Sequence, residues 1–120
     1  MKRILAVDDS PSMREMVQIA LSGAGFEVTQ AADGEEALAA ARAMPFDLVL
    51  SDVNMPRMDG IALIRALRAE TAYRHTPILM LTTESSADAK REGKAAGATG
   101  WIVKPFDPEQ LVATMHRVLR

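Results

Sequence analysis

Residues 47–56 read DLVLSDVNMP, and this stretch decides how the fold is interpreted. Residues 47–51 have the apolar character of a short buried strand, yet Asp52 stands where the apolar run should continue. An ionised aspartate inside a protein costs several kcal/mol unless another group pairs with it. We therefore expect either that Asp52 lies in an exposed turn or that the fold brings a partner to the end of this strand.

Short apolar runs of the same kind recur along the chain, and they predict strands at residues 4–7, 26–28, 47–50, 78–81 and 101–103. The segments between these runs have the spacing of amphipathic helices, beginning with residues 13–24. Asp33, Asp59 and Asp107 each precede such a segment and are candidate N-cap residues. Strand and helix are thus expected to alternate five times.

Such an alternation is typical of α/β folds with a parallel sheet, helices on both faces and right-handed crossovers. Four of the strands read as continuous apolar runs, as burial on both faces requires, whereas residues 26–30 (FEVTQ) alternate and suit an edge strand. We predict a flavodoxin-like five-stranded parallel sheet in the order 2-1-3-4-5, with five helices on both faces. Ligands bind such sheets beyond the carboxyl ends of the strands, where the strand order reverses.

The composition fits one domain over residues 1–120 and narrows the possible functions. The chain is 48% hydrophobic and has no cysteine, so disulfides and thiolate metal sites are excluded. A formal net charge of −2 gives no electrostatic argument for a nucleic-acid partner. Residues 4–7 are too few for a signal peptide, and no apolar stretch is long enough for membrane insertion. We therefore expect a cytoplasmic domain.

Polar residues stand at the ends of the strands that would meet at one edge of the sheet. Asp8 and Asp9 follow the first strand, Asp52 follows the third, Thr82 ends the fourth and Lys104 ends the fifth. Carboxylates gathered in one pocket raise one another's pKa, and a divalent cation removes that conflict. The donors are oxygens, with no Cys or His among them, which favours Mg²⁺ over Zn²⁺, and few protein ligands favour it over Ca²⁺.

Two further groups in this constellation indicate phosphoryl transfer. Lys104 would supply a fixed positive charge, and Thr82 would supply a hydroxyl donor. Phosphoryl transfer depends chiefly on positioning and on charge neutralisation, which such groups provide. Asp52 could then act as a nucleophile and form an aspartyl phosphate.

The stretches VDDS (7–10), DLVLSDVNMPRMDG (47–60), LTTE (81–84) and GWIVKPF (100–106) resemble the receiver domain of two-component response regulators. The resemblance covers essentially the whole chain, and the single-domain chemotaxis regulators are especially similar. It implies that Asp52 is the phosphoacceptor and that a phosphohistidine on a sensor histidine kinase is the donor. It also implies that Asp9 ligates Mg²⁺ directly, that Asp8 helps through water, and that the Asn54 backbone carbonyl is a third ligand.

The same resemblance assigns residues that stabilise the phosphoryl group and residues that transmit the signal. Thr82 would hydrogen-bond the phosphoryl group and Lys104 would pair with it, and the Lys104–Pro105 peptide bond would be cis. Thr82 and Trp101 would be switch residues, with Trp101 at a position where the family usually has Tyr or Phe.

Two more positions would tune the lifetime of the phosphoryl group. They are Asn54 and Glu84, each two residues beyond a residue of the reaction, and this pair resembles that of fast-resetting chemotaxis regulators. The expected partners are a chemotaxis-type sensor kinase and an output protein such as the flagellar motor switch. The protein would be a monomer and a signalling switch that catalyses its own phosphorylation and dephosphorylation, not an enzyme with a separate substrate.

The helix expected between residues 85 and 97 has no large apolar side chain. Ala87, Ala95 and Ala96 are its candidates for facing the core, and alanine buries little area. Gly93 weakens the helix further. We predict that this helix is the most loosely held one and that phosphorylation shifts it together with Trp101. The output partner would then read the face formed by this helix, the last strand and the last helix.

Other functions are open at this point. A small Mg²⁺-dependent phosphatase of the haloacid dehalogenase type would need a second Asp where Asn54 stands, and a flavin carrier would need a phosphate-binding loop where Asp8 and Asp9 stand. A receiver fragment of a longer transcriptional regulator would look the same, although the absence of a linker after the last helix favours a stand-alone switch. A stand-alone phosphorelay shuttle is a further alternative.

Overall fold

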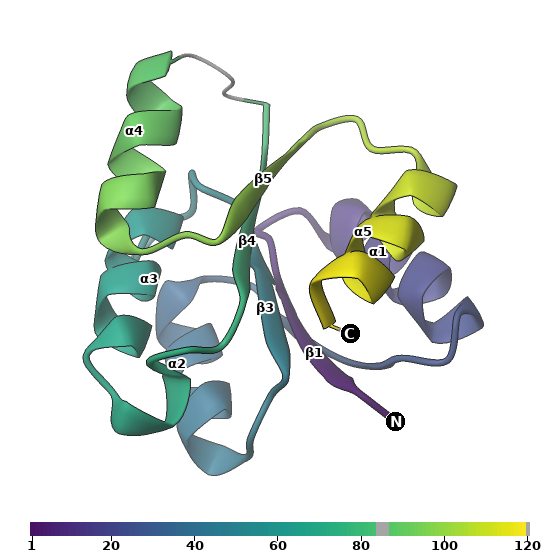
Figure 1. The fold of residues 1–120 in the computed structure, drawn as a ribbon, viewed down its shortest axis with the longest axis horizontal. Helices are drawn as coiled ribbons and strands as arrows, with labels where there is room; N and C mark the ends of the chain where they lie inside the picture. Colours follow the sequence, from purple (N-terminus) through teal and green to yellow (C-terminus); the bar gives the residue numbers. More distant parts are fainter. Residues whose placement is uncertain (84–86, 120) are drawn as a thin grey trace.

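The computed structural model describes residues 1–83 and 87–119, and strands and helices alternate along the chain (Figure 1). The strands are β1 (Arg3–Val7), β2 (Glu27–Ala31), β3 (Leu48–Ser51), β4 (Ile78–Thr82) and β5 (Gly100–Val103). The helices are α1 (Pro11–Gly23), α2 (Gly34–Ala43), α3 (Gly60–Arg68), α4 (Ala87–Ala96) and α5 (Pro108–Leu119), and a short 3-10 helix, η1 (Thr71–Tyr73), precedes β4. Each predicted strand overlaps an observed one, so the predicted alternation is confirmed.

The strands form one parallel sheet in the order β2-β1-β3-β4-β5, which confirms the predicted topology. Helices α1 and α5 cover one face of the sheet, and α2, α3 and α4 cover the other (Figure 1). Each face has its own aliphatic core, with Leu21 and Met115 in the first and Leu38 and Ile64 in the second. The strand order reverses between β1 and β3, so the carboxyl ends of these strands are the expected place for a site.

The two edge strands differ from the three central ones in burial. The central strands β1, β3 and β4 are almost wholly buried, as their apolar runs predict. In β2 only Ala31 is fully buried, which confirms the predicted half-exposed edge. In β5 no residue is fully buried and Val103 is 46% exposed. The expectation that residues 101–103 are buried on both faces is therefore wrong, because the helices cover the sheet less completely at its edge.

The helix starts follow the predicted capping chemistry. The Asp33 and Asp59 carboxylates accept hydrogen bonds from the backbone N–H groups three residues later, at 2.9 and 2.8 Å. Asp107 accepts one from the N–H two residues later, at 3.0 Å. These three aspartates satisfy N–H groups that have no partner within the first helical turn. Asp59 is thus a cap, as predicted, and not a member of the candidate site.

Helix α4 differs from the sequence prediction in the residues that face the core. Ala96 is buried as predicted, but Ala87 and Ala95 are exposed, and the second buried residue is Gly93. A Cβ atom at position 93 would lie 2.5 Å from a carbon of the Trp101 ring. The prediction for Ala87 and Ala95 is wrong because the helix turns its glycine toward β5, where the indole needs the space.

Arg68, at the end of α3, fixes the C-terminal end of α4. Its guanidinium donates two hydrogen bonds to the Gly97 carbonyl, at 3.0 and 2.8 Å, and one each to the Tyr73 and Thr76 carbonyls, at 2.7 Å. Burial lowers the pKa of Arg68. Gly97 has a φ of +114°, a conformation in which glycine commonly ends a helix. One side chain therefore joins α3, the segment before β4 and the end of α4.

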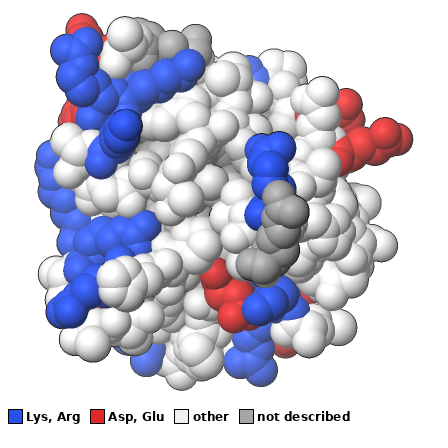
Figure 2. All heavy atoms as spheres, viewed as in Figure 1, with Lys and Arg blue, Asp and Glu red and all other residues white. Residues whose placement is uncertain are grey.

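The surface charge is distributed unevenly. Figure 2 shows Lys and Arg side chains gathered along the edge of the molecule formed by α3 and α4. These helices carry the exposed Arg65, Lys90, Arg91 and Lys94. The chain thus has a locally basic edge despite its net charge of −2. Across the described ranges 1–83 and 87–119, no helix is both long and apolar enough to cross a membrane.

Candidate functional site

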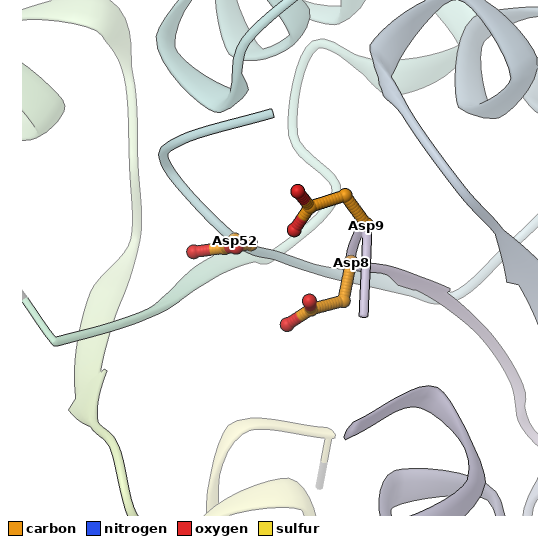
Figure 3. Close-up of side chains that lie close together, drawn as sticks. All are labelled: Asp8, Asp9 and Asp52. Carbon is orange, nitrogen blue, oxygen red and sulfur yellow. The ribbon is translucent and has the colours of Figure 1, made fainter. Parts of the chain in front are cut away.

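Three aspartates meet where β1 and β3 end (Figure 3). The N–H of Asp52 donates to the Val7 carbonyl at 2.9 Å, which continues the hydrogen bonding between the two strands beyond their last residues. One carboxylate oxygen from each of Asp8, Asp9 and Asp52 lies within 4.8 Å of the other two. Asp8 and Asp52 are only 3% and 8% exposed, whereas Asp9 is exposed. The carboxylate cluster expected from the sequence is therefore present.

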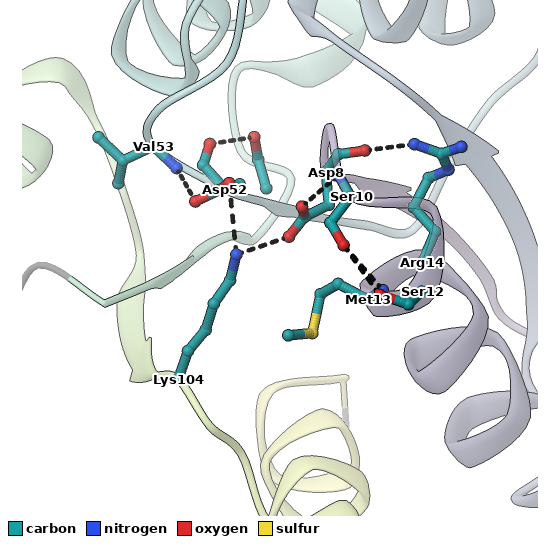
Figure 4. Close-up of polar contacts among 9 residues, drawn as sticks. Asp8, Ser10, Ser12, Met13, Arg14, Asp52, Val53 and Lys104 are labelled. Carbon is teal, nitrogen blue, oxygen red and sulfur yellow. Dashed lines mark hydrogen bonds and ion pairs between the residues drawn. The ribbon is translucent and has the colours of Figure 1, made fainter.

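Hydrogen bonds hold both the side chain and the backbone carbonyl of Asp8 (Figure 4). Its carboxylate accepts from the Ser10 backbone N–H at 2.9 Å and from the Lys104 ammonium at 2.8 Å. Its backbone carbonyl accepts from the Arg14 guanidinium at 2.7 Å. These contacts fix both the side chain and the backbone of Asp8, so its carboxylate faces the site in a defined orientation.

Asp52 is held less tightly than Asp8. Its Oδ1 accepts from the Val53 N–H at 2.8 Å, while its Oδ2 lies 3.3 Å from the Lys104 ammonium (Figure 4). Burial raises the pKa of Asp52, and the neighbouring Asp8 carboxylate adds to this rise, while Lys104 and the Val53 N–H partly oppose it. The ionised form of the Asp52 carboxyl is therefore disfavoured relative to the protonated form. A cation at this site would stabilise the ionised form.

Lys104 supplies the positive charge that the buried Asp52 carboxylate needs as a partner. It comes from the end of β5, and its side chain is only 12% exposed. Burial alone would lower the pKa of Lys104, but the carboxylates of Asp8 and Asp52 outweigh burial and raise it. The Lys104–Pro105 peptide bond is cis, in agreement with the expectation from the resemblance. The lysine is thus a charged group that bridges the ends of β1 and β3.

The remaining predicted site residues lie around this centre in different environments. Thr82 is fully buried at the end of β4, Asn54 is exposed in the loop after β3, and Trp101 is partly buried on β5 against α4. Glu84 lies outside the described residues. The roles assigned to these residues from the resemblance stay predictions.

The composition of the cluster fits a hard cation. Its donors are carboxylate oxygens, which suit Mg²⁺ better than a metal that prefers nitrogen or sulfur. Within the part of the chain that the structure describes, this is the one group of three or more acidic, His or Cys side chains close enough to share an ion. The predicted metal ligands Asp8 and Asp9 are therefore brought to the same place as the predicted phosphoacceptor, Asp52.

Some residues that support the site were not identified from the sequence. Arg14 and the Ser10 N–H hold Asp8, and the fully buried Ser51 hydroxyl donates to the Asp52 carbonyl at 2.9 Å. The serines stand within two positions of a site aspartate, and this closeness in the sequence indicates that they could hydrogen-bond near the site. Arg14 is six residues from Asp8, and its contact depends on how α1 packs against the sheet.

Comparisons with known proteins agree with this geometry. Residues 4–116 match the family model of the response regulator receiver domain. Two solved structures of the chemotaxis protein CheY4 of Vibrio cholerae are 58% identical to the chain, with 99% of both chains covered and TM-scores of 0.96 and 0.95.

The chain is also similar to longer regulators. The DNA-binding response regulator MtrA of Mycolicibacterium smegmatis is 43% identical over 119 residues, and the DNA-binding master transcriptional regulator RpaA of Synechocystis is 37% identical over 120 residues. The chain spans about half the length of these two relatives, 51% of MtrA and 50% of RpaA.

Proposed function

Because the chain belongs to the response regulator receiver domain family of two-component signalling, we propose that Asp52 accepts a phosphoryl group from a phosphohistidine of a sensor histidine kinase. One observation carries this proposal: Asp52 lies at the carboxyl edge of the sheet together with Asp8, Asp9, Thr82 and Lys104. A nucleophilic carboxylate, acidic groups for a cation, an ammonium and a hydroxyl are the groups that phosphoryl transfer to an aspartate needs.

In the proposed reaction an oxygen of the Asp52 carboxylate forms the new O–P bond. The P–N bond of the phosphohistidine breaks, and its electron pair stays on the imidazole nitrogen. The Lys104 ammonium pairs with a phosphoryl oxygen and the Thr82 hydroxyl donates a hydrogen bond to another. Water later hydrolyses the aspartyl phosphate. The protein then acts as a switch that catalyses its own phosphorylation and dephosphorylation, not as an enzyme with a separate substrate.

We assign the cation as Mg²⁺. Asp9, Asp52 and the Asn54 backbone carbonyl would hold it, with Asp8 acting through water. When bound, the cation would neutralise the negative charge that gathers on the carboxylates and the phosphoryl oxygens. The raised pKa of Asp52 supports this assignment, because burial and the Asp8 carboxylate make the ionised nucleophile costly without added positive charge.

The proposed readout is the face formed by α4, β5 and α5. Thr82 lies at the end of β4, and its register partner in the sheet is Val103 on β5, two residues after Trp101. A hollow of about 300 Å³ lies beside Trp101 between β5 and α5, and a second of about 260 Å³ lies between Trp101 and the lysines of α4. A shift of Trp101 and α4 would change the shape of both hollows and thereby the affinity for an output partner.

Chemotaxis is the output that we propose, with the flagellar motor switch as partner. The support is the identity of 58% to a chemotaxis protein over 99% of both chains, against 43% to MtrA over half of that protein. Binding of the phosphorylated form to the motor switch is the expected result. Transfer to a histidine phosphotransfer protein would indicate a phosphorelay shuttle, and an attached DNA-binding domain in the gene product would indicate a transcriptional regulator.

The test of phosphorylation is the intact mass after treatment with acetyl phosphate and Mg²⁺. The expected product carries one added phosphoryl group, and the Asp52→Asn variant carries none. Asp59→Asn is the matched control, because Asp59 caps α3 in the same loop and asparagine is an equally good cap. This control should be phosphorylated like the wild type. Phosphorylation of Asp52→Asn to the same extent would refute the assignment.

A further inference from the structure

The loop that follows Asp52 is attached to α2 by an ion pair that lies outside the phosphorylation site. The guanidinium of Arg57 pairs with the carboxylate of Asp33. The Arg57 side chain is 60% exposed, while that of Asp33 is only 2% exposed, so Arg57 reaches from the surface to a buried anion. The other oxygen of Asp33 caps α2 through the N–H of Glu36.

A second contact joins the same two segments. The N–H of Gly34 donates to the Met58 carbonyl at 3.0 Å, and a Cβ atom at position 34 would lie 2.5 Å from that carbonyl oxygen. Only a residue without a side chain allows this approach. The loop also closes on itself, because the Gly60 N–H donates to the Val53 carbonyl at 2.8 Å.

We propose that these two contacts, Arg57 with Asp33 and Gly34 with Met58, form a latch that positions the Asn54 carbonyl and thereby sets the Mg²⁺ affinity of the site. Asn54 lies three residues before Arg57 in this short closed loop, so a loop freed from α2 would present its carbonyl less often in the binding position. Arg57 is thus a positioning residue. It would not contact the cation, and it would act on the metal site only by holding the loop backbone that carries the Asn54 carbonyl. The inference rests on the metal site of the proposed function.

The sign of the effect separates the latch from simple electrostatics. A guanidinium near a cation site repels the cation, so its removal should tighten Mg²⁺ binding if charge alone acts. Loss of the latch should weaken binding, because a ligand that is no longer held in place must be ordered when the cation binds. The two explanations therefore predict changes of opposite direction.

The experiment measures the Mg²⁺ dissociation constant by isothermal titration calorimetry, together with the melting temperature without metal. Arg57→Asn removes the guanidinium, and asparagine tolerates the left-handed backbone of this residue, whose φ is +65°. Gly34→Ala keeps every charge and forces the Met58 carbonyl away. Both variants should raise the dissociation constant roughly three- to tenfold, at the low end of what supporting residues of metal sites contribute.

Arg42→Gln is the matched control. Arg42 lies on α2 and pairs with Glu70 at 2.9 Å, so this variant removes the same charge from another ion pair and leaves the loop attached. Its dissociation constant should stay within a factor of about two of the wild type. A merely structural role of Arg57 would lower the melting temperature without metal and leave the dissociation constant unchanged.

Unchanged or tighter Mg²⁺ binding by Arg57→Asn and Gly34→Ala would overturn the latch. Asp9→Ala tests the metal site itself in the same titration, since this variant removes a proposed ligand and leaves the latch intact. If wild type and Asp9→Ala bind Mg²⁺ equally, the proposed metal site fails and the latch proposal fails with it. If Asp9→Ala loses binding while both latch variants bind like the wild type, only the latch is wrong.

Discussion

Replacement of Lys104 by methionine tests how the three carboxylates coexist in the metal-free protein. Methionine keeps most of the apolar stem of lysine and removes the ammonium that contacts Asp8 at 2.8 Å and Asp52 at 3.3 Å. In the variant, two buried carboxylates would face each other without a counter-charge. We expect a large loss of stability at neutral pH, together with a strong response to pH and to Mg²⁺.

The magnitude follows from the burial of the three side chains. Removal of one partner from a buried ion pair costs about 3–5 kcal/mol, because the other charge stays buried and unpaired. The side chains of Lys104, Asp8 and Asp52 are 12%, 4% and 11% exposed, so water reaches the group to a small extent. We therefore expect a loss of about 3 kcal/mol in the free energy of unfolding. For a domain of this size that corresponds to a melting temperature lower by roughly 10–15 °C.

The pH dependence has a definite sign. The pKa of Asp52 is raised in the folded protein, so its contribution favours the native state below the unfolded pKa and is lost as the pH rises through the folded pKa. Removal of Lys104 raises the folded pKa of Asp52 further. The difference in stability between wild type and variant should therefore be small near about pH 4 and large near about pH 8. Lys104 itself has a raised pKa, so its stabilising contribution is lost only as the pH rises through that alkaline pKa.

The assay is chemical denaturation at several pH values, with and without Mg²⁺. A cation that binds only the folded state should narrow the difference between Lys104→Met and wild type, since it replaces the missing positive charge. Lys94→Met, at an exposed position of α4, is the control and should change stability by less than about 0.5 kcal/mol. An equal loss at acidic and alkaline pH, or a difference that widens with Mg²⁺, would refute the electrostatic explanation.

Four further predictions follow from the same structure. Asp9→Ala should lose most of the rise in melting temperature that Mg²⁺ gives the wild type, and a scan with and without Mg²⁺ measures it. Asp52→Asn should be more stable than the metal-free wild type at neutral pH, because the raised pKa shows that the ionised carboxylate is disfavoured; lower stability in urea denaturation would contradict this. Arg68→Met should lose about 2 kcal/mol in the same assay, since several partly buried carbonyls lose their donor. Amide hydrogen exchange should be faster in 87–96 than in 108–119, and beryllofluoride, a phosphoryl mimic, should change it; equal protection of both helices would argue against a loosely held α4.

Much of the fold was predictable because it depends on local patterns. Apolar runs and helix caps such as Asp33 and Asp59 can be recognised within short stretches of sequence. The parallel topology follows from the alternation of the strands and helices that they predict. The meeting of Asp8, Asp52 and Lys104 was predictable for the same reason, since each residue ends a strand and the carboxyl ends of parallel strands share an edge.

The rest depends on packing between distant segments. Asp33 was identified as a cap, but nothing near it in the sequence indicates that its other oxygen binds Arg57, 24 residues away. The preference of Lys104 for Asp8 over Asp52 is a matter of half an ångström, from 2.8 to 3.3 Å, which no pattern encodes. Of the α4 residues predicted to face the core, Ala96 was right and Ala87 and Ala95 were wrong, because a helix of small residues carries almost no periodic signal.

The contact between Gly93 and Trp101 makes the residues that evolution can accept at these two positions depend on each other. The indole ring occupies the space that any side chain at 93 would need, since a Cβ atom there would lie 2.5 Å from the ring. A mutation from glycine at 93 is therefore tolerated only after the aromatic ring at 101 becomes smaller or moves away. Among relatives of this chain, we expect tryptophan at 101 to coincide with glycine at 93 and smaller aromatic residues at 101 to permit alanine. The order in which these two substitutions were acquired would be constrained, with glycine at 93 preceding tryptophan at 101.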